Sequence, residues 1–408
     1  MGTVFGLVAL VMSVAVPLAA TPAKAPSPQP APAAAPATDS DVYIVATNGT
    51  VRAEAVADRY GVTVRHTYEA TIQGFSATMT VDQVGSVLGD PAVAYVQRDV
   101  PHHTTGTQAD PPSWGLDRVD QRALPLDASY TYPNDAAAVH AYVIDTGVRT
   151  THADFGGRAE SGYDAVDGGT ADDCHGHGTH VAGTIAGTAH GVAKGARVVA
   201  VRVLDCDGGG TTESVLAGVD WVAANAKKPA VANMSLGGGP DGALDDGVRR
   251  AIASGVTFSL SAGNGTGGEA RPACSQSPAR VAEALTVSAT DREDSRARWA
   301  NVGGCVDLFA PGVGIVSAWG ASDNATRSLS GTSMAAPHVT GAAALYLADH
   351  PAATPPEVAA AVVAGATPGV VRDPMTGTPN LLLHVGEAVP TCPPPTDPSP
   401  SPEPSPTA

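Results

Sequence analysis

Short apolar runs alternate with amphipathic stretches over most of the chain beyond residue 107. Runs that are apolar along their whole length are typical of strands buried on both faces, whereas helical spacing of apolar residues indicates helices. We therefore predict strands over residues 141–144, 198–204, 231–236, 256–261, 285–288 and 306–309, and helices over residues 212–225, 244–253, 333–349 and 356–364. This alternation predicts an α/β domain at residues 107–388, with a mostly parallel sheet and helices on both faces.

The preceding region predicts a separate, small α+β unit at residues 41–103. Its pattern gives a strand over 42–46, a helix over 51–60, a second strand ending at 74–77, a helix from Thr80 and a last strand over 93–96.

Both ends of the chain differ in composition from these two units. An apolar run at residues 4–20 precedes a small-x-small cleavage pattern, so we expect residues 1–25 to be a signal peptide. Residues 26–40 are rich in Pro and Ala, and residues 389–408 in Pro and Ser, which predicts a linker and a disordered tail. No stretch reaches the roughly 20 apolar residues of a membrane span.

Charge and cysteine content narrow the possible partners and the compartment. The net charge is −17, from 40 acidic and 23 basic residues, which disfavours nucleic acid and anionic membranes as partners. Four of the five cysteines could pair to brace loops on a large core. Such pairing requires an oxidising compartment, so we expect a secreted, extracellular protein.

Three polar residues lie at predicted strand ends or helix starts, where α/β sheets form their sites. Asp145 ends the first strand of the domain, His177 follows Gly176 at the start of a helix, and Ser333 opens another helix. A serine nucleophile needs a base, and a neutral imidazole needs an orienting carboxylate. The free N–H groups of a helix start can stabilise an oxyanion. We also expect Pro337 to be tolerated in the first turn of that helix.

Two other interpretations of these residues remain open at this point. A single Ser, His or Asp is more often a surface or capping residue than a catalytic one. The cluster of His175, His177 and His180, with Cys174 beside it, could also bind zinc, although it lacks the general-base glutamate of HExxH.

The motifs around the three residues are VIDTG, HGTHVAGT and GTSMAAPH, which resemble those of the subtilisin family of serine peptidases. VRVLDCDGGG, VANMSLGGG and CVDLFAPG resemble its proteinase K branch, aqualysin-like enzymes in particular. The elements GFSA and AVAYV in residues 41–103 look like the inhibitory propeptide of the family, which is similar to peptidase inhibitor I9. The resemblance implies a secreted serine endopeptidase that is made as an inactive precursor.

The resemblance also implies roles for individual residues. Asp145 would orient His177, which would act as general base and then general acid for the nucleophile Ser333. Asn264 would be the side-chain donor of the oxyanion hole, beside the backbone N–H of Ser333. An ordinary turn asparagine is the alternative for Asn264. Catalysis would need no cofactor.

Substrate contacts and disulfides follow from the same resemblance. An extended peptide would pair with two edge segments, and small residues would line the pocket for the residue before the cut. These residues are Gly208, Gly209, Gly210, Ser235, Leu236 and Gly237 for the edges, and Ala262 and Gly263 for the pocket. Backbone pairing predicts broad specificity, and the small pocket residues favour a large apolar side chain there. Disulfides would join Cys174 to Cys206 and Cys274 to Cys305, with free thiols as the alternative. Cys392 would then have no predicted partner.

Structural calcium is expected at two places by resemblance to related enzymes. One site would use Asp117, Asp120 and Gln121, with Asp127 and Ser129 nearby, although a capping cluster is the alternative. The other would use backbone carbonyls of Ala282 and Ala284 and the carboxylate of Asp307. Calcium needs roughly six to eight oxygen ligands, so water would complete either site.

The expected partners are protein or peptide substrates and the chain's own propeptide, in a monomer. We predict that Ser333 cuts its own chain between Val100 and Asp110, after which the propeptide remains as a product-like inhibitor. The alternatives are a secreted binding protein of the same fold without turnover, and an esterase, since acyl chemistry also works on esters.

Overall fold

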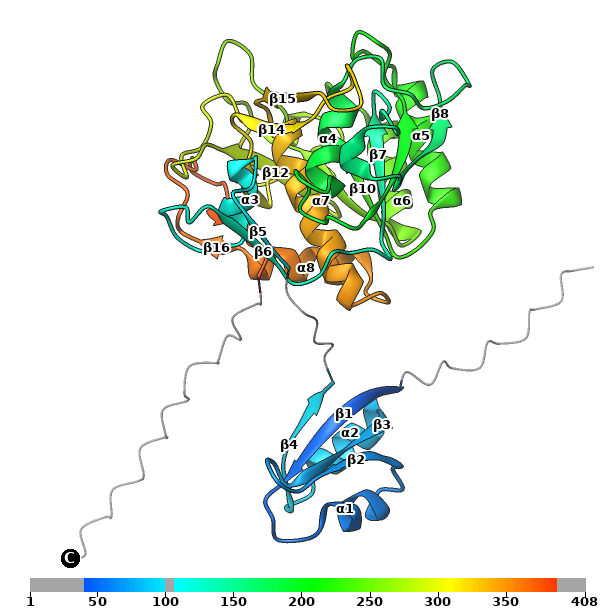
Figure 1. The fold of residues 1–408 in the computed structure, drawn as a ribbon, viewed down its shortest axis with the longest axis vertical. Coiled ribbons are helices and arrows are strands. Elements are labelled where there is room, and N and C mark those ends of the chain that lie inside the picture. Colours follow the sequence, from blue (N-terminus) through cyan, green and yellow to red (C-terminus); the bar gives the residue numbers. More distant parts are fainter. Residues whose placement is uncertain (1–39, 100–105, 387–408) are drawn as a thin grey trace, which may run out of the picture. The chain divides into compact units, whose positions relative to one another are not determined.

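The computed structural model describes residues 40–99 and 106–386 and divides the chain into two compact units, residues 1–100 and 101–408 (Figure 1). The predicted signal peptide, the linker up to residue 39, the tail with Cys392 and part of the predicted cleavage region lie outside the described residues.

The N-terminal unit is a four-stranded antiparallel sheet with two helices. Phe75, Met79 and Val45 are fully buried in its core. The strand order is β2-β3-β1-β4, and the elements are β1 (Ser40–Thr47), α1 (Ala53–Arg59), β2 (Val64–Tyr68), β3 (Gly74–Thr80), α2 (Val81–Leu88) and β4 (Val93–Arg98).

Two local features of this unit bear on the predictions. Thr80 caps α2, since its hydroxyl accepts the N–H of Gln83 and the Gln83 side chain accepts the N–H of Thr80. The predicted strand ending at 74–77 is wrong in extent, because β3 begins at Gly74 and pairs with a separate strand, β2. The exposed polar residues of β2 give it no apolar pattern.

The larger unit is built on a mixed sheet to which the described residues contribute nine strands, in the order β16-β17-β13-β12-β11-β10-β7-β9-β8. The strands from β13 to β8 are parallel to one another. They are β7 (His140–Asp145), β8 (Ala159–Asp164), β9 (Arg197–Arg202), β10 (Ala230–Met234), β11 (Thr257–Ser261), β12 (Leu285–Thr290) and β13 (Leu308–Pro311), with β16 (Thr367–Pro368) and β17 (Leu381–Leu382) at one edge.

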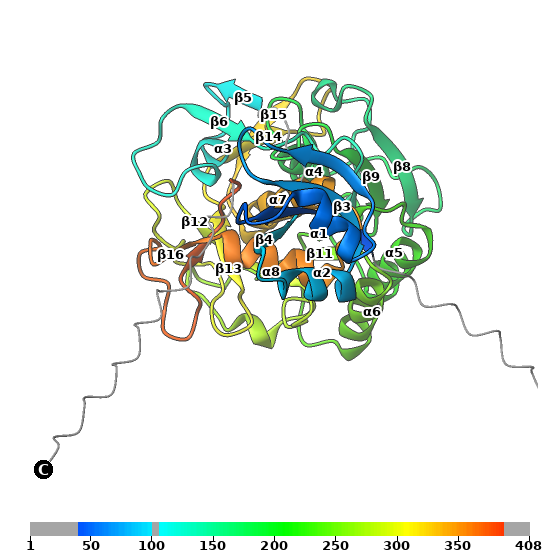
Figure 2. The same cartoon turned by 90° about the horizontal axis from the view of Figure 1, so that it is seen from below.

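Helices cover both faces of this sheet, which confirms the predicted fold class. Along β7, Ala141 and Val143 pack into the apolar cluster with α4, α7 and α8, whereas Tyr142 and Ile144 pack into the cluster with α5 and α6. This alternation explains why the strand is apolar at every position. The helices are α3 (Trp114–Val119), α4 (His177–Ala186), α5 (Thr212–Asn225), α6 (Gly242–Ala253), α7 (Thr332–Asp349) and α8 (Pro355–Gly365); α5 and α6 lie side by side in both views (Figures 1 and 2).

Smaller elements complete the larger unit. Two small antiparallel sheets were not predicted, because their strands have no apolar pattern. They pair β5 (Gly106–Ala109) with β6 (Ser129–Tyr132), and β14 (Ile315–Ala318) with β15 (Thr326–Leu329). Two 3₁₀ turns, η1 (Ala153–Phe155) and η2 (Ala273–Ser275), lie in loops.

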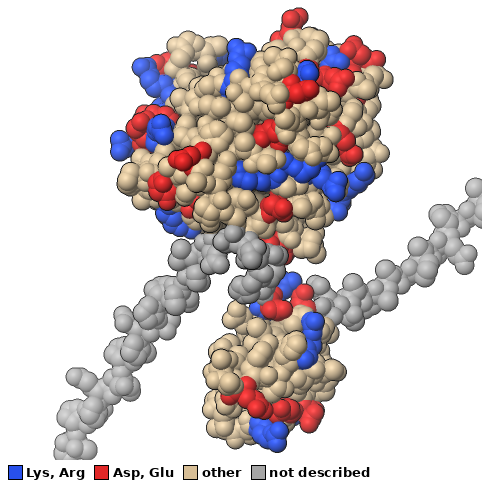
Figure 3. All heavy atoms as spheres, in the orientation of Figure 1, with Lys and Arg blue, Asp and Glu red and all other residues tan. Residues whose placement is uncertain are grey.

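The two predicted disulfides, Cys174–Cys206 and Cys274–Cys305, are present. Acidic and basic side chains are mixed over the face of the larger unit that Figure 3 shows. Within the described ranges, no helix combines the length and apolar character needed to cross a bilayer.

Candidate active site

The catalytic carboxylate candidate lies at the centre of the sheet. β7 pairs with β10 on one side and β9 on the other, and Asp145 is its last residue. The Asp145 side chain is fully buried, and its Oδ1 accepts the N–H of Thr146 at 2.8 Å. The fold therefore places a fixed carboxylate at the carboxyl end of a central strand, as the sequence predicted.

His177 meets this carboxylate from the first residue of α4. Gly176, with a φ of 106°, turns the chain into the helix, and a Cβ at Gly178 would lie 2.1 Å from the carbonyl oxygen of Gly147. Small residues at these places thus allow the helix to approach the end of β7. The His177 Nδ1 lies 2.7 Å from Asp145 Oδ1. A proton shared between these atoms leaves Nε2 as the basic nitrogen of the neutral ring.

The electrostatics of His177 favour its protonated form. Burial of the ring lowers its pKa, but the charge of Asp145, the hydrogen bond to it and the charge of Asp173 outweigh burial, so that the net shift raises the pKa. A raised pKa makes the ring a stronger proton acceptor. It also stabilises the imidazolium that forms when a serine hydroxyl loses its proton.

Asp173 is a site residue that the sequence reasoning missed. Its Oδ1 accepts from the Thr146 hydroxyl at 2.8 Å and from the N–H groups of His175 and Gly176 at 3.0 and 2.7 Å. Its Oδ2 accepts from the N–H and hydroxyl of Thr179. Thr146 in turn accepts the N–H of Gly178 at 3.0 Å. A buried carboxylate thus ties the segment after Asp145 to the start of α4, and an acidic residue just ahead of a helix start was the available sequence signal.

The candidate nucleophile Ser333 is the second residue of α7. Its hydroxyl donates to the carbonyl oxygen of Ser235 at 3.1 Å, and the Ser235 hydroxyl donates to the carbonyl oxygen of Ser333 at 2.8 Å. In the described hydrogen bonds, none joins the Ser333 hydroxyl to His177. Both residues line the same cavity of about 360 Å³.

Pro337 explains the second of these bonds and corrects an expectation. It lies in the second turn of α7, not in the first. Because proline has no N–H, the carbonyl of Ser333 four residues earlier loses its helical partner. The Ser235 hydroxyl occupies that acceptor instead and so fixes the backbone of the candidate nucleophile.

Asn264 lines the same cavity, and its amide oxygen is fixed by hydrogen bonds. Its Oδ1 accepts from the N–H and the hydroxyl of Thr332 at 3.0 and 3.1 Å. The Thr332 hydroxyl also accepts the N–H of Gly263 at 3.1 Å. With its oxygen used in this way, Asn264 has its NH₂ group left to donate to a ligand. Thr332, which sequence reasoning did not single out, therefore orients the oxyanion donor candidate.

The structure brings together both predicted substrate edges. Gly208–Gly210 and Ser235–Gly237 line one groove of about 540 Å³ together with His177. Ala262 is fully buried, and neither it nor Gly263 is among the residues that line the two cavities beside His177. Their role in the pocket for the residue before the cut stays a prediction.

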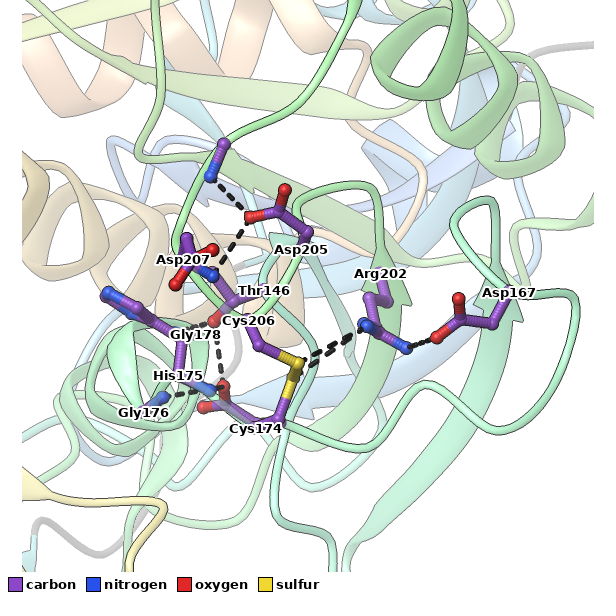
Figure 4. Close-up of a disulfide and its surroundings, with 12 residues drawn as sticks. Thr146, Asp167, Cys174, His175, Gly176, Gly178, Arg202, Asp205, Cys206 and Asp207 are labelled. Carbon is purple, nitrogen blue, oxygen red and sulfur yellow. Dashed lines mark hydrogen bonds and ion pairs between the residues drawn. A yellow bond between two sulfur atoms is a disulfide. The ribbon is translucent and has the colours of Figure 1, made fainter.

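The disulfide Cys174–Cys206 is next in sequence to His175 and Asp207, which line this groove (Figure 4). It joins the segment that leads to His177 with the loop that carries Gly208. Both sulfurs lie near the guanidinium of Arg202, which also pairs with Asp164 and Asp167. The disulfide thus connects the histidine segment and one substrate edge covalently.

The geometry does not support the zinc interpretation of the histidines. Cys174 is in a disulfide, His177 binds Asp145, and His180 Nε2 lies 3.0 Å from two backbone carbonyls, those of Ile315 and Arg327. Burial lowers the pKa of His180 to about 4, so its ring is neutral. Over residues 40–99 and 106–386, no cluster of three or more His, Cys, Asp or Glu side chains has metal-binding geometry.

The first predicted calcium site has donors that suit a hard cation. Asp120 Oδ1 and Gln121 Oε1 are buried without a hydrogen-bond partner among the described residues. Burial first, then the charges of Asp127 and Asp117, raise the pKa of Asp120 to about 6. Asp117 itself accepts the N–H groups of Asp127 and Ala128. The two orphaned oxygens, with the carboxylates of Asp117 and Asp127 nearby, are of the ligand type that calcium prefers.

The second predicted site has one strongly buried carboxylate. Burial raises the pKa of Asp307 to about 6, although its Oδ2 accepts the N–H of Thr286 at 2.7 Å. Ala284 is buried and Ala282 is exposed beside it. A cation would compensate the buried charge of Asp307.

An Asp–His pair at the end of a parallel sheet, with a helix-opening serine in the same cavity, defines a serine peptidase of the subtilisin type. Residues 139–386 match the subtilase family and residues 32–105 match peptidase inhibitor I9. The chain belongs to the subtilase family, and its N-terminal unit is of the inhibitory propeptide type.

Relatives and a solved structure agree with this assignment. The extracellular serine proteinase of Thermus sp. (strain Rt41A) is 53% identical over 325 residues, which cover 79% of this chain and 78% of that protein. The alkaline serine exoprotease A of Vibrio alginolyticus is 49% identical over 331 residues, 80% of this chain and 61% of that protein. The crystal structure of a cold adapted subtilisin-like serine proteinase matches with 54% identity and a TM-score of 0.65, covering 67% of this chain and 98% of that one. The chain is thus a serine endopeptidase.

Proposed function

We propose that Ser333 attacks the carbonyl carbon of a bound peptide while His177 Nε2 takes its proton. Asp145 holds the ring and stabilises the imidazolium, and Asn264 and the N–H of Ser333 donate to the oxyanion. The tetrahedral intermediate collapses to an acyl-enzyme as His177 returns the proton to the leaving amine. Water then releases the acid by the reverse proton route. The observation that carries this proposal is the 2.7 Å Asp145–His177 bond beside the cavity of Ser333 and Asn264.

Substrate binding by strand addition is supported by the groove that the two edges line. An extended peptide could pair its backbone with Gly208–Gly210 on one side and Ser235–Gly237 on the other. Backbone pairing ignores side chains, so we propose broad specificity. A large apolar residue before the cut, in a pocket near Ala262 and Gly263, belongs to the same proposal.

Maturation should proceed by a cut between Val100 and Asp110 within the chain itself. Residues Gly106–Ala109 form β5, which is paired with β6. A paired strand is a poor substrate, so we favour the part of the range ahead of β5, at residues 100–105, outside the described residues. The segment before the cut, residues 41–103, would remain bound as a product-like inhibitor.

The remaining parts of the proposal concern the compartment and calcium. An apolar N-terminal run, two disulfides and an extracellular relative support secretion. Asp117, Asp120, Gln121 and Asp307 would hold structural calcium, while catalysis uses the chain's own side chains. We expect the mature enzyme to be a monomer.

Maturation provides the test of this function. The precursor with Ser333→Ala should keep residues 41–103 covalently attached when expressed and purified alone, whereas the unmodified precursor should lose them. Mass spectrometry of the termini and casein digestion, with and without a serine-directed sulfonyl fluoride, measure both results. Correct cleavage of the purified Ser333→Ala precursor without added protease would show that this serine does not make the cut.

A further inference from the structure

The two cavities that meet at His177 carry charges of opposite sign. The groove of the substrate edges is lined by Asp207 and Asp241, and no Lys or Arg is among the described residues that line it. The cavity on the far side of Ser333 is lined by Arg327, with no Asp or Glu among its described lining residues. His175 and His177 line both.

The negative side of the cleft rests on a free carboxylate. Asp207 is exposed, and no hydrogen bond or ion pair in the described residues involves its side chain. Within its loop, Asp205 Oδ1 accepts the N–H groups of Asp207 and Gly209 at 3.0 and 2.8 Å (Figure 4). The nearby cation Arg202 is neutralised by Asp164 and Asp167. Asp241 stays ionised at the start of α6, since hydrogen bonds from Thr212 first, and then from Leu244 and Ala243, lower its pKa.

The positive side rests on an arginine held over an aromatic ring. β14 packs against α4, and β15 pairs with β14. The guanidinium carbon of Arg327 lies 4.5 Å from the centre of the Trp319 ring, which orders an exposed side chain without neutralising it. Asp323, the acidic residue of the loop between β14 and β15, is paired with Arg149 at 2.7 Å. The charge of Arg327 is thus available to a ligand.

His175 connects the two charged sides on one face of the cleft. Its ring lies 6.4 Å from the Trp319 ring, and a Cβ at Gly208 would lie 3.3 Å from its Nε2. Side chains of an extended peptide alternate between two faces, so the second residue before the cut and the first residue after it point the same way. Both should point towards this histidine face, one near Asp207 and the other near Arg327.

We propose that the cleft selects peptides by charge across the scissile bond, with a basic residue at the second position before the cut and an acidic residue at the first position after it. This inference rests on the proposed function, because that function puts the acyl segment along the Gly208 and Ser235 edges and the leaving segment beside Arg327. It narrows the broad backbone-based specificity to a preferred class of sequence.

Three peptides that share one apolar residue before the cut test the inference on the mature enzyme. One peptide carries Lys at the second position before the cut and Glu at the first position after it. The second peptide has Glu and Lys exchanged, and the third has Ala at both positions. At low ionic strength, kcat/KM for the Lys–Glu peptide should exceed that for the Glu–Lys peptide about five- to twentyfold. Because the charges are exposed, about 1 M salt should remove most of this ratio.

Variants assign the effect to the two residues. Arg327→Gln should abolish the preference for Glu after the cut but keep that for Lys before it, and Asp207→Asn should do the reverse. Arg327→Lys should retain the preference for Glu. Arg249→Gln is the control, since Arg249 is a partly exposed residue of α6 that pairs with Asp246 and Glu283 and lines neither cavity. For Arg249→Gln, the ratio of kcat/KM between the Lys–Glu and Glu–Lys peptides should equal that of the unmodified enzyme.

Equal cleavage of the three peptides would overturn the charge selection and leave the peptidase function intact. A ratio that persists in Arg327→Gln and in high salt would also overturn it, because the preference would then be steric. Failure to cleave any peptide would instead contradict the proposed function itself.

Discussion

The two halves of the candidate active site are organised differently. On the acid–base side, Asp145 and His177 are already bonded at 2.7 Å, and the buried Asp173 fastens both segments. On the nucleophile side, the Ser333 hydroxyl donates to the carbonyl of Ser235 rather than to His177. The difference teaches that the sheet and the start of α4 build the proton acceptor in advance. The candidate nucleophile, Ser333, would have to exchange its bond to Ser235 for one to His177.

The largest expected effect comes from removing the nucleophile. Ser333→Ala should lower kcat by roughly 10⁶-fold, a figure taken from subtilisin itself, while the Asp145–His177 pair remains in place. Single-turnover assays on a peptide substrate measure the loss. Near-normal proteolysis would break the assignment of the nucleophile half.

The oxyanion donor should rank second. Asn264→Ala should lower kcat by about 10²- to 10³-fold, again the size known from subtilisin, with little change in KM, because the amide acts on charge that develops in the transition state. Steady-state kinetics separate the two parameters. A large rise in KM with kcat intact would mean that Asn264 binds the substrate instead.

A smaller and more selective effect is expected on the acid–base half. Because the pKa of His177 is raised, the acid limb of kcat/KM should lie above the usual imidazole value of about 6.5, and activity should persist in mild alkali. Asp173→Asn removes a negative charge that favours the imidazolium, so the limb should move to lower pH. Looser placement of His177 at the start of α4 should also lower kcat, by about tenfold or more.

Asp172→Asn is the matched control for this variant. Asp172 is exposed, and its carboxylate accepts a hydrogen bond from the Thr170 hydroxyl. Its pH profile should match that of the unmodified enzyme. An unmoved limb in Asp173→Asn, or an equal shift in the control, would show that Asp173 does not set the protonation of His177.

The smallest effect on activity is expected from calcium. If ions bind at Asp120 and Asp307, a chelator should lower Tm by about 5–10 °C, since a bound metal stabilises only the folded state, and should leave kcat at 25 °C unchanged. In Asp120→Ala combined with Asp307→Ala, the chelator should no longer shift Tm. Calorimetry with added calcium or chelator measures both. An unchanged Tm of the unmodified enzyme in excess chelator would show that neither site binds a stabilising calcium ion.

The sequence predicted the parts of the site that depend on local order. Asp145, His177 and Ser333 lie in motifs where a strand end or a helix start dictates their placement. Contacts between distant segments were not predictable in this way. Thr332 orients Asn264 across 68 residues, and Ser235 replaces the helical partner of Ser333 across 98 residues.

Dependence on distant segments also explains the strands that the sequence did not predict. The buried strands of the parallel sheet carry an apolar pattern, whereas β2 and β15 have mostly exposed residues, and their position depends on the partner strand. The opposite charges of Asp207 and Arg327 were likewise not predictable from the sequence. The fold brings both residues to cavities that His177 also lines.

Covalent labelling of the mature enzyme tests the central claim most directly. A serine-directed sulfonyl fluoride should form one adduct per chain, on Ser333, and casein digestion should fall in proportion to the labelled fraction measured by peptide mass spectrometry. Complete loss of digestion with the adduct on another residue, or full digestion by protein labelled at Ser333, would contradict the account.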